Sequence, residues 1–194
     1  PDLTPGAAPK DIGKLIEERY KPLALAIHHF PVPVIAAVNG VAAGAGANLA
    51  LNCDIVLAAK SASFIQAFSK IGLIPDCGGS WLLPRLVGRA NAMALALLGE
   101  KCSAEEAQRI GLIWRCVADD ALATETQALA ARLAALPAKA LAETRRAFDN
   151  ADRMGLDGAL SLEADVQRRL GMSHDYLEGV SAFFAKRAPV FKDR

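Results

Sequence analysis

The stretch VIAAVNGVAAGAGANLALNCDIVLAA, residues 34–59, decides how the chain is expected to fold. Its two ends, VIAAV at 34–38 and DIVLAA at 54–59, are short, apolar and partly β-branched, as strands buried on both faces tend to be. Between them, a loop rich in glycine and alanine leads into a series of helix-forming residues. The stretch therefore predicts a strand, a glycine loop, a helix and a second strand.

The segments around this stretch extend the prediction to an α/β fold. Residues 11–30 space their apolar side chains as an amphipathic helix that ends before Pro31, and Ser63 to Gln66 could add another short strand. Ser103 and Glu106 fit a capping box at the start of a later helix. A strand-rich first half followed by a helical second half is typical of α/β proteins. Helices are expected at 78–98, 104–110, 119–135, 137–151, 155–170 and 173–186.

Composition excludes several classes of protein. The 194 residues, 53% of them hydrophobic, suit one compact domain with a sizeable core. Lys and Arg number 22 against 21 Asp and Glu, with no long run of either sign, so we expect neither a nucleic-acid partner nor a membrane partner. The four cysteines lack zinc-site spacing and are expected to be reduced thiols. With no apolar stretch of membrane-spanning length and no signal-peptide pattern, a cytoplasmic protein is expected.

The glycine loop has three possible interpretations when it is taken alone. The start of the following helix offers free N–H groups to an anion or a developing oxyanion, and Gly44, Ala45 and Gly46 would let a ligand approach closely. A dinucleotide fingerprint is disfavoured because Leu49 stands where its third glycine is required. Small residues that only allow close packing of a helix on a sheet remain the structural alternative.

Residues 33–88, together with EEAQRIGLI at 105–113 and EGVSAFFAKRAPVF at 178–191, resemble the crotonase (enoyl-CoA hydratase/isomerase) superfamily. The resemblance implies a spiral of ββα units followed by a helical trimerisation region, in an enzyme that stabilises a thioester enolate with two backbone N–H groups. It places the core at 11–116 and the oligomerisation region at 117–194, whereas the prolines and the glycine of residues 1–10 predict a mobile loop there. The expected partners are an acyl-CoA thioester and two further copies of the chain, as a homotrimer or a dimer of trimers.

The resemblance also assigns the catalytic residues. It makes the N–H of Ala45 one oxyanion donor, whereas the other comes from an earlier A-G-x-D-L segment, so we expect the sequence to begin after that segment. Asn48 and Phe68 stand where hydratases of the family carry their two glutamates, and neither can act as a general acid or base at neutral pH. Asp76, in GLIPDCGGSW, stands where several isomerases carry a single catalytic carboxylate. An aspartate there could instead cap the helix that follows, and the two roles are compatible unless the carboxylate is tied to the backbone.

The expected activity is therefore acyl-CoA isomerisation by one aspartate. The motifs are most similar to family members that convert a ring epoxide of phenylacetyl-CoA to an oxepin and shift β,γ double bonds into conjugation. Other crotonase reactions, such as hydration or dienoyl-CoA isomerisation, and a non-catalytic RNA-binding role are the alternatives. No cofactor and no metal are expected, coenzyme A being part of the substrate. The residues expected to bind substrate are Gly44, Gly46, Asn48, Phe68, Ile74, Phe183 and Lys186.

Overall fold

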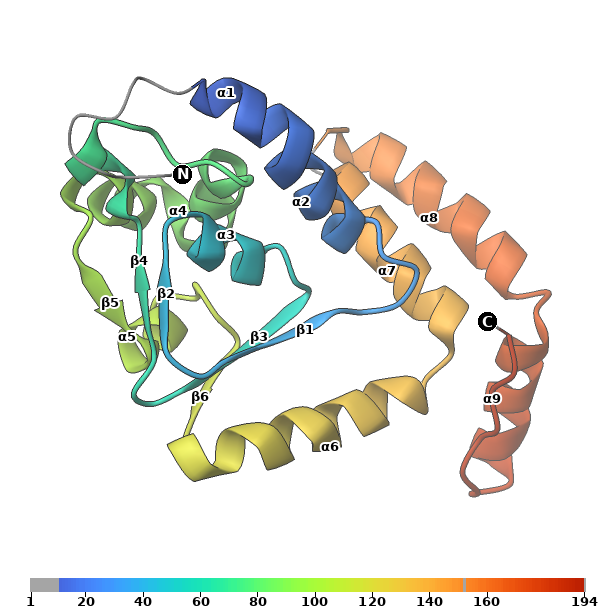
Figure 1. Cartoon of the computed structure of the whole chain (residues 1–194). Helices are drawn as coiled ribbons and strands as arrows, with labels where there is room; N and C mark the ends of the chain where they lie inside the picture. The colour runs from blue at the N-terminus through green and yellow to red at the C-terminus, as the bar shows by residue number, and fades with distance from the viewer. Residues whose placement is uncertain (1–10, 152, 194) are drawn as a thin grey trace. The chain divides into compact units, whose positions relative to one another are not determined.

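The computed structural model describes residues 11–151 and 153–193, so the mobile loop predicted at 1–10 lies outside the described residues (Figure 1). The chain divides into two compact units, where composition alone predicts one domain. Residues 11–30 and 34–122 form what we call the strand unit. Residues 31–33 and 123–193 form the helical unit. The described chain beyond residue 122 builds helices and no strand.

Two three-stranded sheets make up the strand unit. The first has the order β1 (Ile35–Val38), β3 (Ile55–Ala59), β6 (Arg115–Val117), and all its strands are parallel. The second has the order β2 (Val41–Ala43), β4 (Ser63–Ile65), β5 (Lys101–Ser103), with β2 parallel and β5 antiparallel to β4. The sequence predicts β1, β3 and β4 but not the three-residue strands β2, β5 and β6.

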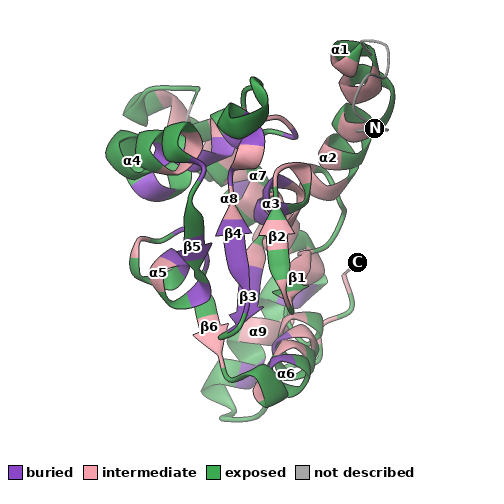
Figure 2. Cartoon of the chain, turned by 60° about the vertical axis from the view of Figure 1, so that its left-hand side comes forward, coloured by how far each residue is buried: buried purple, intermediate pink, exposed green. Residues whose placement is uncertain are grey.

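The chain passes from one sheet to the other and then into a helix, twice in succession. β1 and β2 are followed by α3 (Ala45–Leu51), whereas β3 and β4 are followed by the 3₁₀ turn η2 (Ala67–Ile71) and by α4 (Gly79–Leu98). This is the ββα repetition that the resemblance implies. The central strands β3 and β4 are the most buried (Figure 2), with Leu57 and Phe64 exposed by 1% and 2%.

The predicted helix at 11–30 is one helical run with a wider turn in its middle. It consists of α1 (Ile12–Leu15), the π-helical turn η1 (Ile16–Tyr20) and α2 (Lys21–His28). The Asp11 carboxylate accepts the Lys14 N–H at 2.9 Å and caps its start. Pro22 has no N–H to continue the hydrogen-bond ladder, and the wider turn lies directly before it.

The predicted helix at 78–98 is broken in the structure. α4 contains Pro84, and Gly88 leaves the helical conformation with φ 70° and ψ 164°. Proline removes one backbone donor, and only glycine adopts such a positive φ without strain, so the two residues together turn the chain within this element. The sequence pattern predicts the length of α4 correctly but not its break.

Only one of the two hydrogen bonds of the predicted capping box at Ser103 forms among the described residues. α5 (Ala104–Arg109) begins where the Ser103 hydroxyl accepts the Glu106 N–H at 3.1 Å. Glu106 does not complete the box, because its carboxylate pairs with Arg109 at 2.5 Å. Lys60, the residue after β3, forms an exposed ion pair at 3.0 Å with Glu105 of the same helix.

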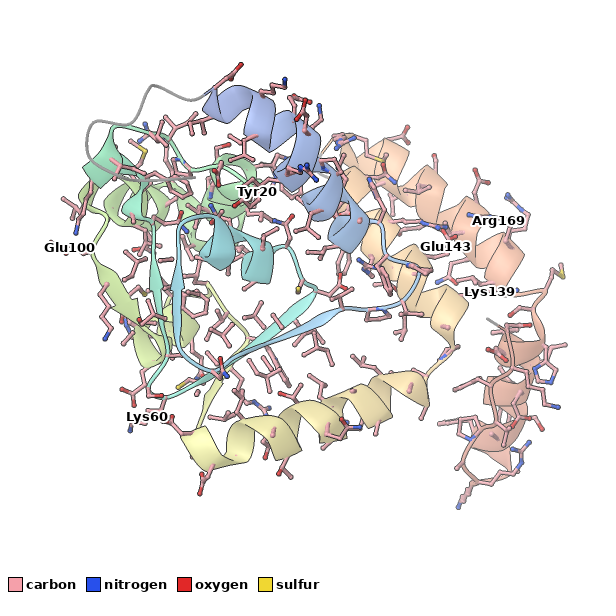
Figure 3. All side chains as sticks on the ribbon, in the orientation of Figure 1. Tyr20, Lys60, Glu100, Lys139, Glu143 and Arg169 are labelled. Carbon is pink, nitrogen blue, oxygen red and sulfur yellow. The ribbon has the colours of Figure 1, made fainter. Side chains whose placement is uncertain are left out.

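Four helices form the helical unit: α6 (Leu122–Ala134), α7 (Ala138–Ala151), α8 (Leu156–Leu170) and α9 (His174–Phe184). The 3₁₀ turn η3 (Asp119–Ala121) precedes α6, so the predicted helix at 119–135 does not begin as an α-helix. Glu143 of α7 accepts hydrogen bonds from Arg146 at 2.9 Å and from Arg169 of α8 at 3.4 Å, which joins the two helices (Figure 3).

The residues after α9 fold back along it. The Glu178 carboxylate accepts two hydrogen bonds from the Arg187 guanidinium, at 2.6 and 2.8 Å, and one from the Val190 N–H at 2.8 Å. The buried Asp175 carboxylate accepts the N–H groups of Lys192 and Asp193. Two carboxylates on one face of α9 therefore hold the tail, residues 185–193.

This attachment makes part of the stability depend on pH. Hydrogen bonds from Arg187 and then from Val190 lower the pKa of Glu178 to about 2, from an ordinary value of 4.5. Because the folded-state pKa is the lower one, the stabilisation is complete above pH 4.5 and disappears as the pH falls towards 2. As the pH is lowered from 4.5 to 2, we expect the melting temperature of Glu178→Gln to fall less than that of the unchanged protein. Equal decreases would show that Glu178 does not hold the tail in solution.

None of the helices described is long and apolar enough to cross a membrane. The four cysteines, Cys53, Cys77, Cys102 and Cys116, are free thiols, as predicted.

Candidate active site

The site begins at the turn between β2 and α3. Gly44 has φ 53° and ψ −127°, a conformation that glycine adopts readily and that other residues rarely adopt. Its N–H donates to the Ile65 carbonyl of β4 at 2.8 Å. α3 then starts at Ala45, whose N–H has no acceptor among the described residues. The ring of Phe68 lies against this turn, 3.6 Å from where a Cβ on Gly44 would stand. The turn thus presents one free backbone donor above a buried aromatic ring.

The second element of the site is the loop that carries Asp76 into α4. Cys77 and Gly78 both have positive φ, 48° and 84°, and Gly78 is the N-cap of α4. No side chain caps this helix. The alternative role of Asp76 as the helix cap is therefore wrong, because Gly78 is the N-cap and no described side chain bonds to the first helical N–H groups. Asp76 is partly buried, and its Oδ1 is inaccessible and has no hydrogen-bond partner in the described chain.

Asn48 joins the glycine turn to the Asp76 loop. Its side chain is fully buried, and its Nδ2 donates to the Asp76 carbonyl at 2.9 Å. Its Oδ1 accepts from Gln66 Nε2 at 2.8 Å. One turn further along α3, Asn52 Nδ2 donates to the Cys77 carbonyl at 2.7 Å. The structure thus shows Asn48 within the protein's own hydrogen-bond network, on the helix that begins at Ala45.

Cys77 offers no second catalytic group. Its thiol is 5% exposed, and burial together with the adjacent Asp76 carboxylate raises the pKa of Cys77 to about 12. The thiol therefore stays protonated at neutral pH, and it is the thiolate that acts as a nucleophile or base.

Three apolar side chains close to Asp76 in the sequence have different environments in the structure. Phe68 is 5% exposed and packs as a core residue beneath the turn. Ile74, expected to bind substrate, is 78% exposed. Trp81 points to α2, where its ring meets the edge of His28 at 5.9 Å, and Arg85 stacks on it at 4.2 Å. His28 is half-buried.

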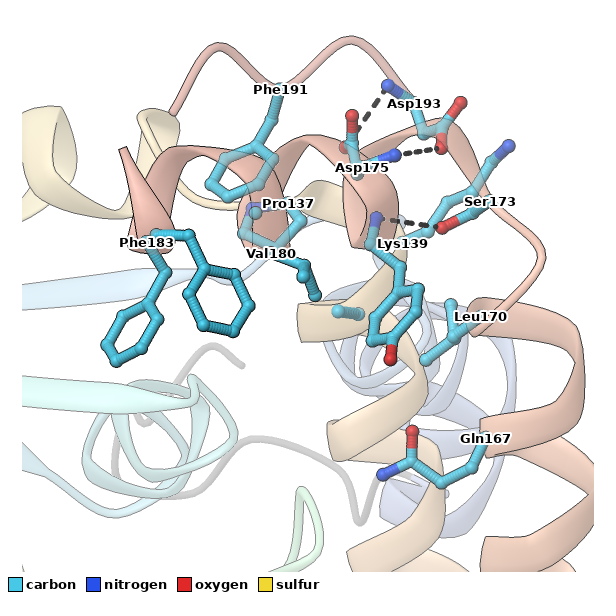
Figure 4. A pocket seen from close by; sticks show the side chains of 14 residues that line it. Pro137, Lys139, Gln167, Leu170, Ser173, Asp175, Val180, Phe183, Phe191 and Asp193 are labelled. Carbon is cyan, nitrogen blue, oxygen red and sulfur yellow. Dashed lines mark hydrogen bonds between the residues drawn. The ribbon is translucent and has the colours of Figure 1, made fainter. Parts of the chain in front are cut away.

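The two predicted coenzyme A residues lie in the helical unit. Phe183 of α9 is 78% exposed and borders a largely apolar cavity of about 440 Å³ between α9, the tail, and α7 and α8 (Figure 4). Lys186 follows α9 with φ 51° and is exposed. His174, Asp175 and Asp193 approach one another in the same unit, within 4.8 Å. There the Asp175 carboxylate accepts backbone N–H groups of the tail, which accounts for this cluster without a ligand.

Sequence reasoning missed Gln66, Asn52 and Gly79. Gln66 is 3% exposed and directly follows the buried strand β4. A polar side chain next to a predicted buried strand indicates a buried hydrogen-bond network, because buried amides are nearly always hydrogen-bonded. Gly79 leaves room for Asn48, since a Cβ on Gly79 would stand 2.7 Å from Cγ of the Asn48 amide. No periodic pattern reveals a contact between residues so far apart in the sequence.

A family model described as enoyl-CoA hydratase/isomerase matches residues 5–194, and the chain belongs to that family. It is 56% identical to a 1,2-epoxyphenylacetyl-CoA isomerase of Escherichia coli (strain K12), over 96% of this chain and 71% of the relative. It is 52% identical to a probable enoyl-CoA hydratase of Rhodobacter capsulatus, over 100% of this chain and 76% of the relative.

Solved structures confirm the crotonase fold. A putative enoyl-CoA hydratase/isomerase from Mycobacterium abscessus superposes with a TM-score of 0.90 at 38% identity, over 94% of this chain and 70% of that one. Pseudomonas aeruginosa DspI superposes with a TM-score of 0.91 at 31% identity, over 98% of this chain and 73% of that one. The predicted spiral of ββα units is therefore the fold of this chain.

Proposed function

We propose that the protein is an acyl-CoA isomerase that converts ring-1,2-epoxyphenylacetyl-CoA to an oxepin-CoA and shifts β,γ double bonds of acyl-CoA thioesters into conjugation. The observation that carries the proposal is the Asp76 carboxyl, which is partly buried, excluded from helix capping and unpaired at Oδ1 within the described chain. A partly buried carboxylate that caps no helix and has one unpaired oxygen is a candidate proton-transfer group. The relative from Escherichia coli supports the choice of substrate.

The proposed double-bond shift needs only one carboxylate. Asp76 removes the proton from the carbon next to the thioester, which leaves a dienolate whose negative charge rests largely on the thioester oxygen. The free Ala45 N–H donates a hydrogen bond to that oxygen, at the positive end of α3. Asp76 then returns the proton two carbons further along, so that the double bond lies in conjugation and the carboxylate is regenerated.

Hydration is the second candidate, since the Rhodobacter capsulatus relative is a probable hydratase. Hydration requires a positioned water in addition to a proton donor. At the two positions that carry glutamates in hydratases, this chain has Asn48, whose buried amide donates to and accepts from protein groups, and Phe68, which is apolar. These residues favour isomerisation.

The deciding experiment supplies three thioesters separately: a β,γ-unsaturated acyl-CoA, its α,β isomer and ring-1,2-epoxyphenylacetyl-CoA. We expect conjugated and oxepin products whose mass equals that of the substrate. Preferential conversion of the α,β isomer to a product heavier by one water would establish a hydratase instead. Assembly as a homotrimer or a dimer of trimers belongs to the same proposal and rests on the family resemblance, whereas the proposed place in the cytoplasm rests on the composition of the chain.

A further inference from the structure

The hydrogen bonds between α3 and the Asp76 loop run in one direction only. The Asp76 carbonyl can only accept, so the amide group that faces it must be Nδ2 of Asn48. The remaining Oδ1 of Asn48 can only accept, so Gln66 must present its Nε2. The Asp76 carbonyl therefore fixes the orientation of the Asn48 amide and, through it, that of the Gln66 amide.

The loop held in this way is strained. A non-glycine residue at φ 48°, as in Cys77, followed by Gly78 at 84°, is a costly backbone sequence that persists only where the surroundings impose it. Asn48 and Asn52 hold the carbonyls of Asp76 and Cys77, the two peptide groups that enter this turn. The Asp76 carbonyl also accepts the Gly79 N–H at 2.8 Å, which closes the turn onto α4.

The consequence concerns the Asp76 side chain. In a relaxed approach to α4, an aspartate at this place would turn its carboxylate to the free N–H groups of the first helical turn. The left-handed turn makes Gly78 the N-cap instead, and the carboxylate is not used by the backbone. The strain therefore keeps the carboxylate available.

We propose that Asn48 is a positioning residue, which acts with Gln66 and Asn52 to hold the strained turn that keeps the Asp76 carboxylate free for proton transfer. This inference rests on the proposed function, because it gives Asn48 a role only through Asp76. It differs from a substrate-binding role, since the Asn48 amide spends Nδ2 and Oδ1 on protein partners and is fully buried.

Asn48→Asp tests the inference, because it keeps the shape of the side chain and replaces the donor Nδ2 by an oxygen. When ionised, the introduced carboxyl repels the Asp76 carbonyl; when protonated, it can donate to that carbonyl as the amide does. Burial raises the pKa of such a carboxyl. The elements packed on α3 are β1, β2 and α4, and their charged residues are Arg85, stacked on Trp81, and Arg89. The Asp76 carboxyl and the Cys77 thiol are the titratable groups of the adjoining loop.

We expect Asn48→Asp to lower kcat for the double-bond shift by about 100-fold at pH 8, the effect of misplacing a catalytic group by about 1 Å, with KM changed less than twofold. The ratio of the variant's kcat to that of the unchanged protein should rise as the pH is lowered to 5.5, since the protonated carboxyl can again donate to the Asp76 carbonyl. Asn91→Asp is the matched control, because Asn91 Nδ2 also donates to a backbone carbonyl but within α4, and its kcat should not change.

A ratio that is low but independent of pH, or a loss expressed in KM alone, overturns the positioning role. If Asn48→Asp does not fold, Asn52→Leu provides the second test, since it removes the donor to the Cys77 carbonyl at similar volume, and an unchanged kcat in that variant overturns the inference. The Asp76→Asn variant separates the two proposals. Activity that survives Asp76→Asn refutes the proposed function, whereas its loss combined with an unaffected Asn48→Asp refutes only the positioning role.

Discussion

Asp76→Asn is expected to lower the rate of proton exchange at the α-carbon of a β,γ-unsaturated acyl-CoA by about 100- to 10,000-fold, the usual contribution of a general acid–base group. The amide has the size of the carboxylate but cannot take up a proton near neutral pH. The exchange is followed in heavy water by the mass of the recovered thioester. Asp120→Asn is the matched control, since Asp120 is an exposed aspartate of η3 in the same unit, and its exchange rate should be unchanged.

The stability of the Asp76→Ala variant tests separately whether the carboxylate caps α4. An N-cap aspartate replaced by alanine costs about 0.5–2 kcal/mol of stability. Because Asp76 caps no helix and its Oδ1 has no partner in the described chain, Asp76→Ala should leave the free energy of unfolding unchanged or raise it. A loss within the range for a cap, measured by denaturant unfolding, would show that the carboxylate does bond to the backbone in solution. Exchange that survives Asp76→Asn would place the base elsewhere.

Gly79→Ala is expected to destabilise the protein by about 1–3 kcal/mol, the usual cost of adding one carbon to a well-packed interior. The new Cβ would stand 2.7 Å from Cγ of the Asn48 amide, nearer than van der Waals contact allows. Asn48 cannot move away easily, since its side chain is fully buried and held at both ends. The displacement should also release the Asp76 carbonyl and lower the isomerisation rate.

Two further variants identify the contact that is responsible. Gly46→Ala is the matched control: Gly46 is also helical, nothing lies within 4 Å of its Cβ position, and its substitution should not destabilise the fold. The double variant Gly79→Ala, Asn48→Ala should be less destabilised than the sum of its single changes, because removing the amide makes room for the added carbon. Additive losses would mean that Gly79 is needed for another reason.

The sequence predicts the elements that have a strong local pattern. The strands at 34–38 and 54–59 are confirmed as β1 and β3, because continuous apolar runs mark strands buried on both faces. The strands β2, β5 and β6 were not predicted, since three residues are too few to show an alternation of apolar and polar side chains. Each of them forms a strand only because it pairs with a strand elsewhere in the sequence. The break in α4 at Gly88 was missed for the same reason: a glycine is compatible with a helix until its φ is known.

The sequence predicts some residues of the candidate site but not their geometry. Motif matching brings Ala45, Asn48 and Asp76 together, and the structure places Asn48 between the turn and the loop. The exclusion of Asp76 from capping depends on the backbone angle of Cys77, which a residue of this type rarely adopts and which no sequence pattern shows. The partner Gln66 contacts Asn48 across 18 positions of sequence, so only the folded chain shows their hydrogen bond.

The order of the strands in the first sheet limits when that sheet can form during synthesis of the chain. Its central strand, β3, pairs on one side with β1, where Ile35 lies opposite Ile55, and on the other with β6, where Leu57 lies opposite Arg115. The first pairing closes a short loop and is possible once β3 has left the ribosome. The second must wait until the whole of α4 and α5 has been made, and closing a longer loop costs more conformational entropy. Until then one edge of β3 has no partner strand, which makes the nascent chain most vulnerable to aggregation after the segment that bears Asp76 has been synthesised.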